Sequence, residues 1–122
     1  MRTRDQQRAQ KAYGLTVALK DTSDAAKYGS FVLSMPILLR SAGLLGALQF
    51  AQQKQKRLVD HVAEHLVEAG LLKQGQDLHE RVRTAHLAEY MRLTREVQAI
   101  LTWHKRFAQS VLKAEPGEEP RS

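Results

Sequence analysis

Residues 61–65 read His-Val-Ala-Glu-His, a short motif with residue types that could hold a metal ion. In the inverted zinc-peptidase motif, two histidines four residues apart on a helix bind zinc and the glutamate activates water. A catalytic zinc needs a third protein ligand, and no downstream His or Glu stands at a family spacing. On a helical wheel His65 lies at the edge of an apolar stripe, and Glu64 lies on the far side. We therefore interpret His61 and His65 as boundary residues of a packed helix and predict no metal site.

Other catalytic signatures are missing from the chain, including the nucleophile elbow, the P-loop and the dinucleotide fingerprint. Because the chain has no cysteine, disulfides, thiolate metal sites and cysteine nucleophiles are excluded. We predict no catalytic residue, no cofactor and no enzymatic activity. A small all-α mutase or hydrolase built from scattered Arg and Glu remains an alternative, because such a site leaves no local motif.

The basic residues are more informative. The 122 residues contain 19 Lys and Arg against 13 Asp and Glu, a net charge of +6, and residues 1–113 alone carry +8. Such a charge favours a polyanionic partner, and three basic clusters at helical spacing point to a surface that binds phosphates. The candidate nucleic-acid contacts in these clusters are Arg8, Lys11, Lys54, Arg57, Arg95 and Arg106.

The aromatic residues limit how a nucleic acid could be read. Five of them are expected at or beside core-facing helical positions: Tyr13, Phe31, Phe50, Trp103 and Phe107. This leaves no exposed platform for stacking bases, so we expect backbone contacts in place of base readout. No helix-turn-helix spacing or zinc finger is visible, and sequence specificity would then come from a guide strand or a partner protein. A free helical DNA-binding regulator remains a further alternative.

The elements that position these residues are predicted to be helices, because apolar residues recur with a period near 3.6 and no alternating strand pattern occurs. The fold class is all-α, a single compact domain of about five or six helices over residues 1–113. Thr3 and Gln6 form a predicted capping box, and residues 20–24 form a turn. Pro36 either starts a short helix or kinks a longer one, and Gly43 ends it. The later helices are expected over 44–54, 56–69, 77–91 and 93–111.

Two segments of the chain call for a separate interpretation. Residues 28–53 are apolar enough to span a membrane, but Arg40 near the middle would cost about 2.5 to 3.5 kcal/mol there. We interpret this window as the centre of a helical domain with no membrane partner. No export signal is visible, which favours the cytoplasm. Residues 114–122 are acidic and have no core-forming residue, and we predict a disordered tail.

Several of these features occur together in one known family. They are Arg8-Ala9, Tyr28-Gly29-Ser30, Pro36, Gly43-Leu44, the run Ala47-Leu48-Gln49-Phe50, Lys54, Tyr90, Thr94, Glu96 and the run 103–108. In this order and at these separations they resemble the small-subunit family of the Cmr CRISPR effector complex, type III-B of the RAMP module. The resemblance covers residues 8–108. Ala42 is a departure, since the family often has Asn before the Gly-Leu pair.

The resemblance implies a compact, non-catalytic helical subunit that stacks with neighbouring copies of itself along a filament of RAMP backbone subunits. It further implies the large polymerase-like subunit as a partner. CRISPR RNA and complementary target RNA would lie in the groove that this small subunit lines, and cleavage would belong to other subunits. A cationic surface fits this expectation, because base pairing reads the sequence while the protein contacts phosphates.

Overall fold

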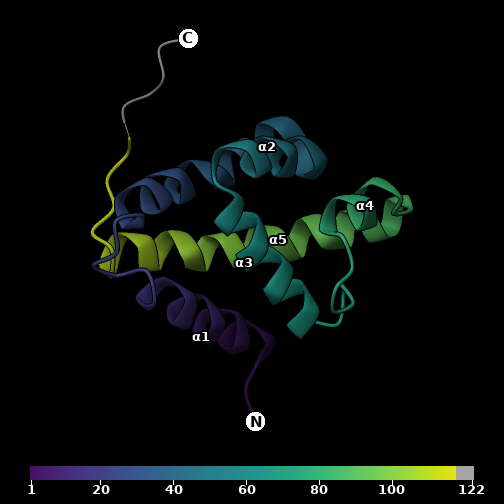
Figure 1. Ribbon diagram of the computed structural model, residues 1–122. Helices are drawn as coiled ribbons and strands as arrows, with labels where there is room; N and C mark the ends of the chain where they lie inside the picture. Colours follow the sequence, from purple (N-terminus) through teal and green to yellow (C-terminus); the bar gives the residue numbers. More distant parts are fainter. Residues whose placement is uncertain (118–122) are drawn as a thin grey trace.

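The computed structural model describes residues 1–117, which form five α-helices and no strand. The helices are α1 (Arg4–Val17), α2 (Ala25–Lys54), α3 (Lys56–Glu68), α4 (Leu78–Arg83) and α5 (Leu87–Ser110). The long helix α5 lies between α1 and α2, α3 crosses the other helices, and α4 packs against α2 (Figure 1). This arrangement confirms the predicted all-α fold in one compact domain.

The first helix begins as its sequence predicts. The hydroxyl of Thr3 accepts a hydrogen bond from the backbone N–H of Gln6 at 3.0 Å, and the Gln6 side chain accepts one from the Thr3 N–H at 2.8 Å. This is a complete capping box, which satisfies two backbone donors at the helix start. Only two residues of α1 are buried, Ala12 and Thr16. Because both are small, they allow the backbone of α1 to lie close to α5.

The second helix continues through Pro36 and breaks at Gly43. Pro36 lies inside α2, and the only residue of α2 with non-helical backbone angles is Gly43, at φ 78° and ψ 170°. The longer-helix alternative is therefore correct for Pro36, and the predicted helix stop at Gly43 is confirmed. This region of backbone space is essentially restricted to glycine, because a Cβ atom would clash there. Ala42, which departs from the Asn often found before the Gly-Leu pair, does not prevent the helix from breaking at Gly43.

The two arms of α2 fold back on each other at Gly43. The rings of Phe31, on the first arm, and Phe50, on the second arm, stack with centroids 6.0 Å apart. The second arm begins like a new helix, and its early backbone donors need partners. The phenol oxygen of Tyr90 on α5 accepts a hydrogen bond from the N–H of Leu45 at 3.1 Å. Tyr90 thus holds the start of the second arm against α5.

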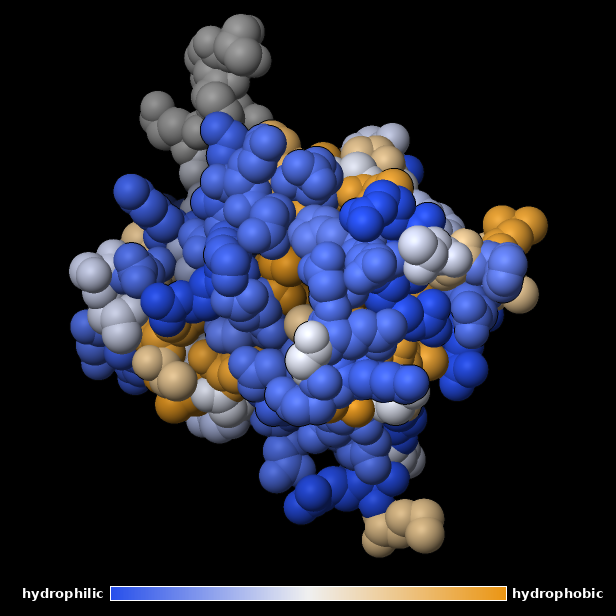
Figure 2. All heavy atoms as spheres, turned by 45° about the vertical axis from the view of Figure 1, so that its right-hand side comes forward, coloured by the Kyte–Doolittle hydropathy of each residue, from blue (hydrophilic) through white to orange (hydrophobic). Residues whose placement is uncertain are grey.

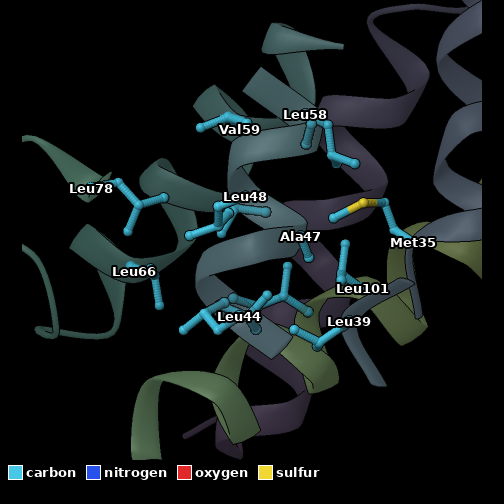
Figure 3. Close-up of a cluster of buried hydrophobic side chains, with 14 of the residues drawn as sticks. Met35, Leu39, Leu44, Ala47, Leu48, Leu58, Val59, Leu66, Leu78 and Leu101 are labelled. Atoms are coloured by element: carbon cyan, nitrogen blue, oxygen red, sulfur yellow. The ribbon is translucent and has the colours of Figure 1, made fainter. Parts of the chain in front are cut away.

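The core lies where both arms of α2 meet α3, α4 and α5. Helix α2 alone contributes nine buried residues, which agrees with its interpretation as the centre of a helical domain. By length and composition α2 is also the one helix within residues 1–117 that could cross a membrane. Figure 3 shows leucine side chains from several helices interleaved around the second arm. Labelled there are Met35, Leu39, Leu44, Ala47, Leu48, Leu58, Val59, Leu66, Leu78 and Leu101.

One predicted helix is wrong. Asp77 caps a helix as expected, since its carboxylate accepts the N–H of Glu80 at 3.3 Å, but α4 ends at Arg83 instead of continuing to residue 91. The hydroxyl of Thr84 donates to the Glu80 carbonyl at 2.8 Å, which satisfies one of the last helical acceptors. The chain then redirects, and α5 begins six residues earlier than predicted, at Leu87 in place of residue 93. Leu87 and Met91 belong to α5 and are exposed.

The predicted disordered tail, residues 114–122, lies only partly within the described residues. Residues 118–122 are outside them. Ala114 donates its backbone N–H to the Ala108 carbonyl at 2.9 Å and packs against the core. A Cβ atom placed on the buried Gly29 would come within 2.8 Å of the Ala114 Cβ, so glycine is required for this close approach.

Candidate nucleic-acid interface

The outward face of α5 carries the polar stripe that the sequence predicts. Arg95, Gln98, Thr102 and Arg106 are all exposed. Neither arginine forms an ion pair with another described residue, and α5 has no acidic residue after Glu96. We call these four residues the α5 stripe. The Asp5 carboxylate of α1 is the acidic group that lies near Arg106, but it forms no ion pair with this arginine. Figure 2 shows one largely hydrophilic face of the molecule, with apolar side chains in the gaps between polar ones and a few at its margins.

Arg106 is held in place by an aromatic neighbour. Its guanidinium carbon lies 4.8 Å from the centre of the Trp103 ring, which is a cation–π contact. The indole N–H of Trp103 donates to the carboxylate of Asp5 on α1 at 3.0 Å. This hydrogen bond, together with the one from Arg8, lowers the pKa of Asp5 below its ordinary value.

The prediction that the five aromatic residues lie at or beside core-facing positions and leave no exposed ring is wrong for Tyr13 and Phe50. Tyr13 is 51% exposed and Phe50 42% exposed. Tyr13 lies over the seam between α1 and α5, where its ring meets the edge of Phe107 at a centroid distance of 5.3 Å. The helical spacing is core-like, but the buried residues of α1 are Ala12 and Thr16, while the Tyr13 ring lies against Phe107 at the surface. Aromatic rings therefore remain at the surface beside the α5 stripe.

Arg8 joins two helices. Its guanidinium donates two hydrogen bonds to Glu96 on α5, each 2.8 Å long, and a third to Asp5 at 3.0 Å. The carboxylate of Glu96 also accepts a hydrogen bond from Arg4 at 2.8 Å. The hydrogen bond from Arg8 is the main cause of the lowered pKa of Glu96, and the reverse effect raises the pKa of Arg8. Arg8, with a side chain 17% exposed, acts as a tie between α1 and α5.

The other predicted RNA contacts differ in whether their positive charge already forms an ion pair within the protein. Lys11 pairs with Glu64 of α3 at 3.2 Å, and Arg57 pairs with Asp24 at 3.3 Å. Lys54 is exposed and makes no ion pair with a described residue. Its Nζ lies 6.0 Å from the centre of the Phe50 ring. The six candidates come from four helices: Arg95 and Arg106 share a face of α5, and Arg8 and Lys11 lie three residues apart on α1.

The two histidines of the His-x-x-Glu-His motif are buried, and the predicted boundary position is wrong. His61 is 8% exposed and His65 is not exposed at all, while Glu64 turns outward to Lys11. No group of three His, Cys, Asp or Glu residues within the described part of the chain could hold a metal ion. The ring nitrogens are instead engaged in a buried chain of hydrogen bonds.

This histidine–tyrosine chain connects α2, α3 and α5. The phenol oxygen of Tyr28 lies 2.6 Å from Nδ1 of His61 and 3.3 Å from Nδ1 of His104, and Nε2 of His104 lies 2.9 Å from Nε2 of His65. The three bonds can be made with all three rings neutral, and Nδ1 of His65 is then left without a partner. No described carboxylate is hydrogen-bonded to these rings.

Burial controls the protonation of the histidine–tyrosine chain. Removal from water disfavours the charged form, and it lowers the pKa of His104 to about 3 and that of His65 to about 4. The same cause lowers the pKa of His61 and raises that of Tyr28. The rings are therefore neutral at physiological pH. The buried rings fill space in the core, and their hydrogen bonds connect three helices.

The molecule also has an open hollow between α2 and α3. Its walls include Asp24, Arg57, Asp60, His61 and Glu64. Arg57 pairs with Asp24, and Asp60 pairs with Lys56 at 3.2 Å, so these charges balance one another. His61 directs Nδ1 to Tyr28. The hollow thus has no nucleophile with an adjacent base of the kind that a hydrolase site needs.

Fold and surface together define a small all-α domain in which α5, packed between α1 and α2, exposes a cationic stripe. The family model described as CRISPR-associated protein (Cas_Cmr5) matches residues 4–111. A curated relative, the CRISPR system Cmr subunit Cmr5 of Thermus thermophilus, is 37% identical over 113 residues, which are 93% of this chain and 99% of the relative. The chain therefore belongs to the Cmr5 family of CRISPR-associated proteins, and the resemblance seen in the sequence is confirmed.

A solved structure agrees with this assignment. The crystal structure of a CRISPR-associated Cmr5 family protein from Thermus thermophilus is similar to this chain, with a TM-score of 0.75 and 37% sequence identity. The match covers 91% of this chain and 98% of the solved chain.

Proposed function

We propose that this protein is the non-catalytic small subunit of a type III-B Cmr effector complex, and that the α5 stripe faces the groove in which CRISPR RNA and complementary target RNA pair. Membership of the Cmr5 family supports the place in a Cmr complex, since a relative is named as a Cmr subunit. Both arginines of the α5 stripe are exposed and neither forms an ion pair with a described residue, and this is the observation that carries the proposed RNA contact.

The α5 stripe fits phosphates better than base edges. Arg95 and Arg106 are eleven residues apart, which corresponds to about 16 Å along a helix. A pair of cations at this separation can contact a polynucleotide backbone at two separate phosphates without reading its sequence. Lys54 is a third proposed contact. Arg8, Lys11 and Arg57 stay predictions as RNA contacts, and each would first have to leave the carboxylate it now binds.

The remaining partners are proposed on the same basis. The small subunit would lie beside copies of itself, the RAMP backbone subunits and the large polymerase-like subunit, in the cytoplasm. Strand cleavage would belong to those other subunits, and this chain would need no cofactor. Its contribution would be to hold the RNA and support the filament.

The binding of single-stranded RNA by the full chain tests the α5 stripe. Each phosphate contact on a single strand contributes a slope of about −0.7 to the logarithm of affinity against the logarithm of salt concentration. With three contacts, affinity should fall roughly tenfold or more between 50 and 200 mM salt. Fluorescence anisotropy of a labelled oligonucleotide measures this. Arg95→Ala should flatten the slope by about 0.7.

A matched control is Arg83→Ala, which removes one exposed positive charge from α4 and not from the α5 stripe. It should leave the slope unchanged. An equal change for both variants would mean that net charge alone drives binding, and the assignment of the α5 stripe would be wrong.

A further inference from the structure

Four side chains form a continuous ladder across the seam between α1 and α5. Arg106 lies over Trp103 at 4.8 Å, Trp103 stacks with Phe107 at 5.8 Å and an interplanar angle of 24°, and Phe107 meets Tyr13 edge-on at 5.3 Å. We call these four residues the aromatic ladder. It adjoins the α5 stripe, because Arg106 belongs to both.

The aromatic ladder is both accessible and fixed. Tyr13 is 51% exposed, Arg106 is exposed, and Trp103 and Phe107 are half-buried. The Trp103 indole is oriented by its hydrogen bond to Asp5, and that carboxylate is held in turn by Arg8. A ligand would therefore meet planar groups whose orientation is already set, which reduces the entropy lost on binding.

The chemistry of the ladder matches an unpaired nucleobase. Aromatic faces and guanidinium planes are the surfaces on which splayed bases of single-stranded RNA stack, and the positive charge of Arg106 favours a polyanion. Bases inside a duplex are already stacked on one another and cannot use such a surface. A ladder of this kind is not needed by a surface that contacts only phosphates.

We propose that the aromatic ladder binds an unpaired base of single-stranded RNA, with the base stacked at the end formed by Arg106 and Trp103. This inference rests on the proposed function and deepens it, since it adds to the phosphate contacts of the α5 stripe a stacking contact with a base that is not paired in the guide–target duplex. The α5 stripe would contact the adjoining phosphates while the ladder holds the base.

Trp103 is the only tryptophan of the chain, so its fluorescence reports on the ladder directly. The full chain is titrated with a short oligouridylate and, separately, with inorganic polyphosphate, which carries charge but no base. We expect both polymers to bind and only the RNA to quench Trp103. Quenching by both polymers, or by neither although both bind, would show that the aromatic ladder does not stack a base. The proposed phosphate contacts of the α5 stripe would then still stand. Failure of both polymers to bind would overturn the stripe as well.

Two charge-conserving variants separate stacking from charge. Arg106→Lys keeps the charge and loses the planar group, and we expect it to weaken RNA binding roughly five- to tenfold while leaving polyphosphate binding unchanged. Arg83→Lys on α4 is the control, because this exposed arginine belongs neither to the α5 stripe nor to the aromatic ladder, and it should change neither affinity by more than about twofold. Equal losses of RNA affinity in both variants would contradict the inference.

Discussion

Lowering the pH from 7 to 5 is expected to reduce the free energy of unfolding by roughly 3 kcal/mol. The cause is the histidine–tyrosine chain, in which burial lowers the pKa of His65 to about 4 and that of His104 to about 3. In the unfolded chain both rings take up a proton near pH 6.5, whereas in the folded protein they stay neutral. The unfolded state therefore binds more protons below pH 6.5, and the stability present above that pH is lost as the pH falls toward the two folded values.

Urea unfolding at pH 7 and pH 5 measures this effect. His65→Gln offers an amide N–H in place of the ring Nε2 and cannot titrate, so it should remove about half of the pH dependence. His86→Gln changes an exposed histidine outside the chain of hydrogen bonds and should leave the dependence unchanged. Equal stability at pH 5 and pH 7 in the unsubstituted protein would show that the buried rings are not held neutral by the fold.

Removing the Glu96 carboxylate is expected to destabilise the protein by about 2 to 3 kcal/mol. Its side chain is only 10% exposed and accepts hydrogen bonds from both Arg8 and Arg4. In Glu96→Ala the two guanidinium groups lose the anion they share, Arg8 keeps only Asp5, and α1 loses its main polar link to α5. Thermal and urea unfolding measure the loss.

Glu64→Ala is the control for this effect, because Glu64 forms a more exposed pair with Lys11 and should cost less than about 0.5 kcal/mol. The RNA affinity of Glu96→Ala carries further information. If Arg8 is a structural tie, affinity stays within about twofold of the unsubstituted chain once the variant is folded. A large gain in affinity would instead mean that Glu96 normally keeps Arg8 away from RNA.

Local signals predict much of this fold. The capping box at Thr3, the cap at Asp77 and the stop at Gly43 depend on neighbouring residues only, and the structure confirms all three. The exposed face of α5 is likewise visible as a helical period. By contrast, the break between α4 and α5 has no glycine or proline to mark it. The break depends on how the two helices pack, and a periodic pattern of apolar residues carries no information about that packing.

The features that the sequence does not predict arise from contacts between distant residues. Tyr28 and His104 are 76 residues apart, and Arg8 and Glu96 are 88 apart. No spacing rule predicts such pairs, so helical periodicity alone suggests a boundary position for the histidines and a free cation at Arg8. The exposure of Tyr13 is likewise not predicted, because Ala12 and Thr16 are the residues of α1 that are buried, while the Tyr13 ring stays at the seam with α5.

Site-specific photo-crosslinking in the assembled effector complex tests the central claim that the α5 stripe faces RNA. A benzophenone amino acid is placed at Thr102, in the middle of the stripe, or at Ser41, an exposed position on α2 outside it. The complex is loaded with guide and target RNA and irradiated. We predict strong crosslinking of RNA from position 102 and little from position 41. An assembled complex in which position 102 yields no RNA adduct, or in which position 41 yields more, would contradict the proposed RNA-facing role of this helix.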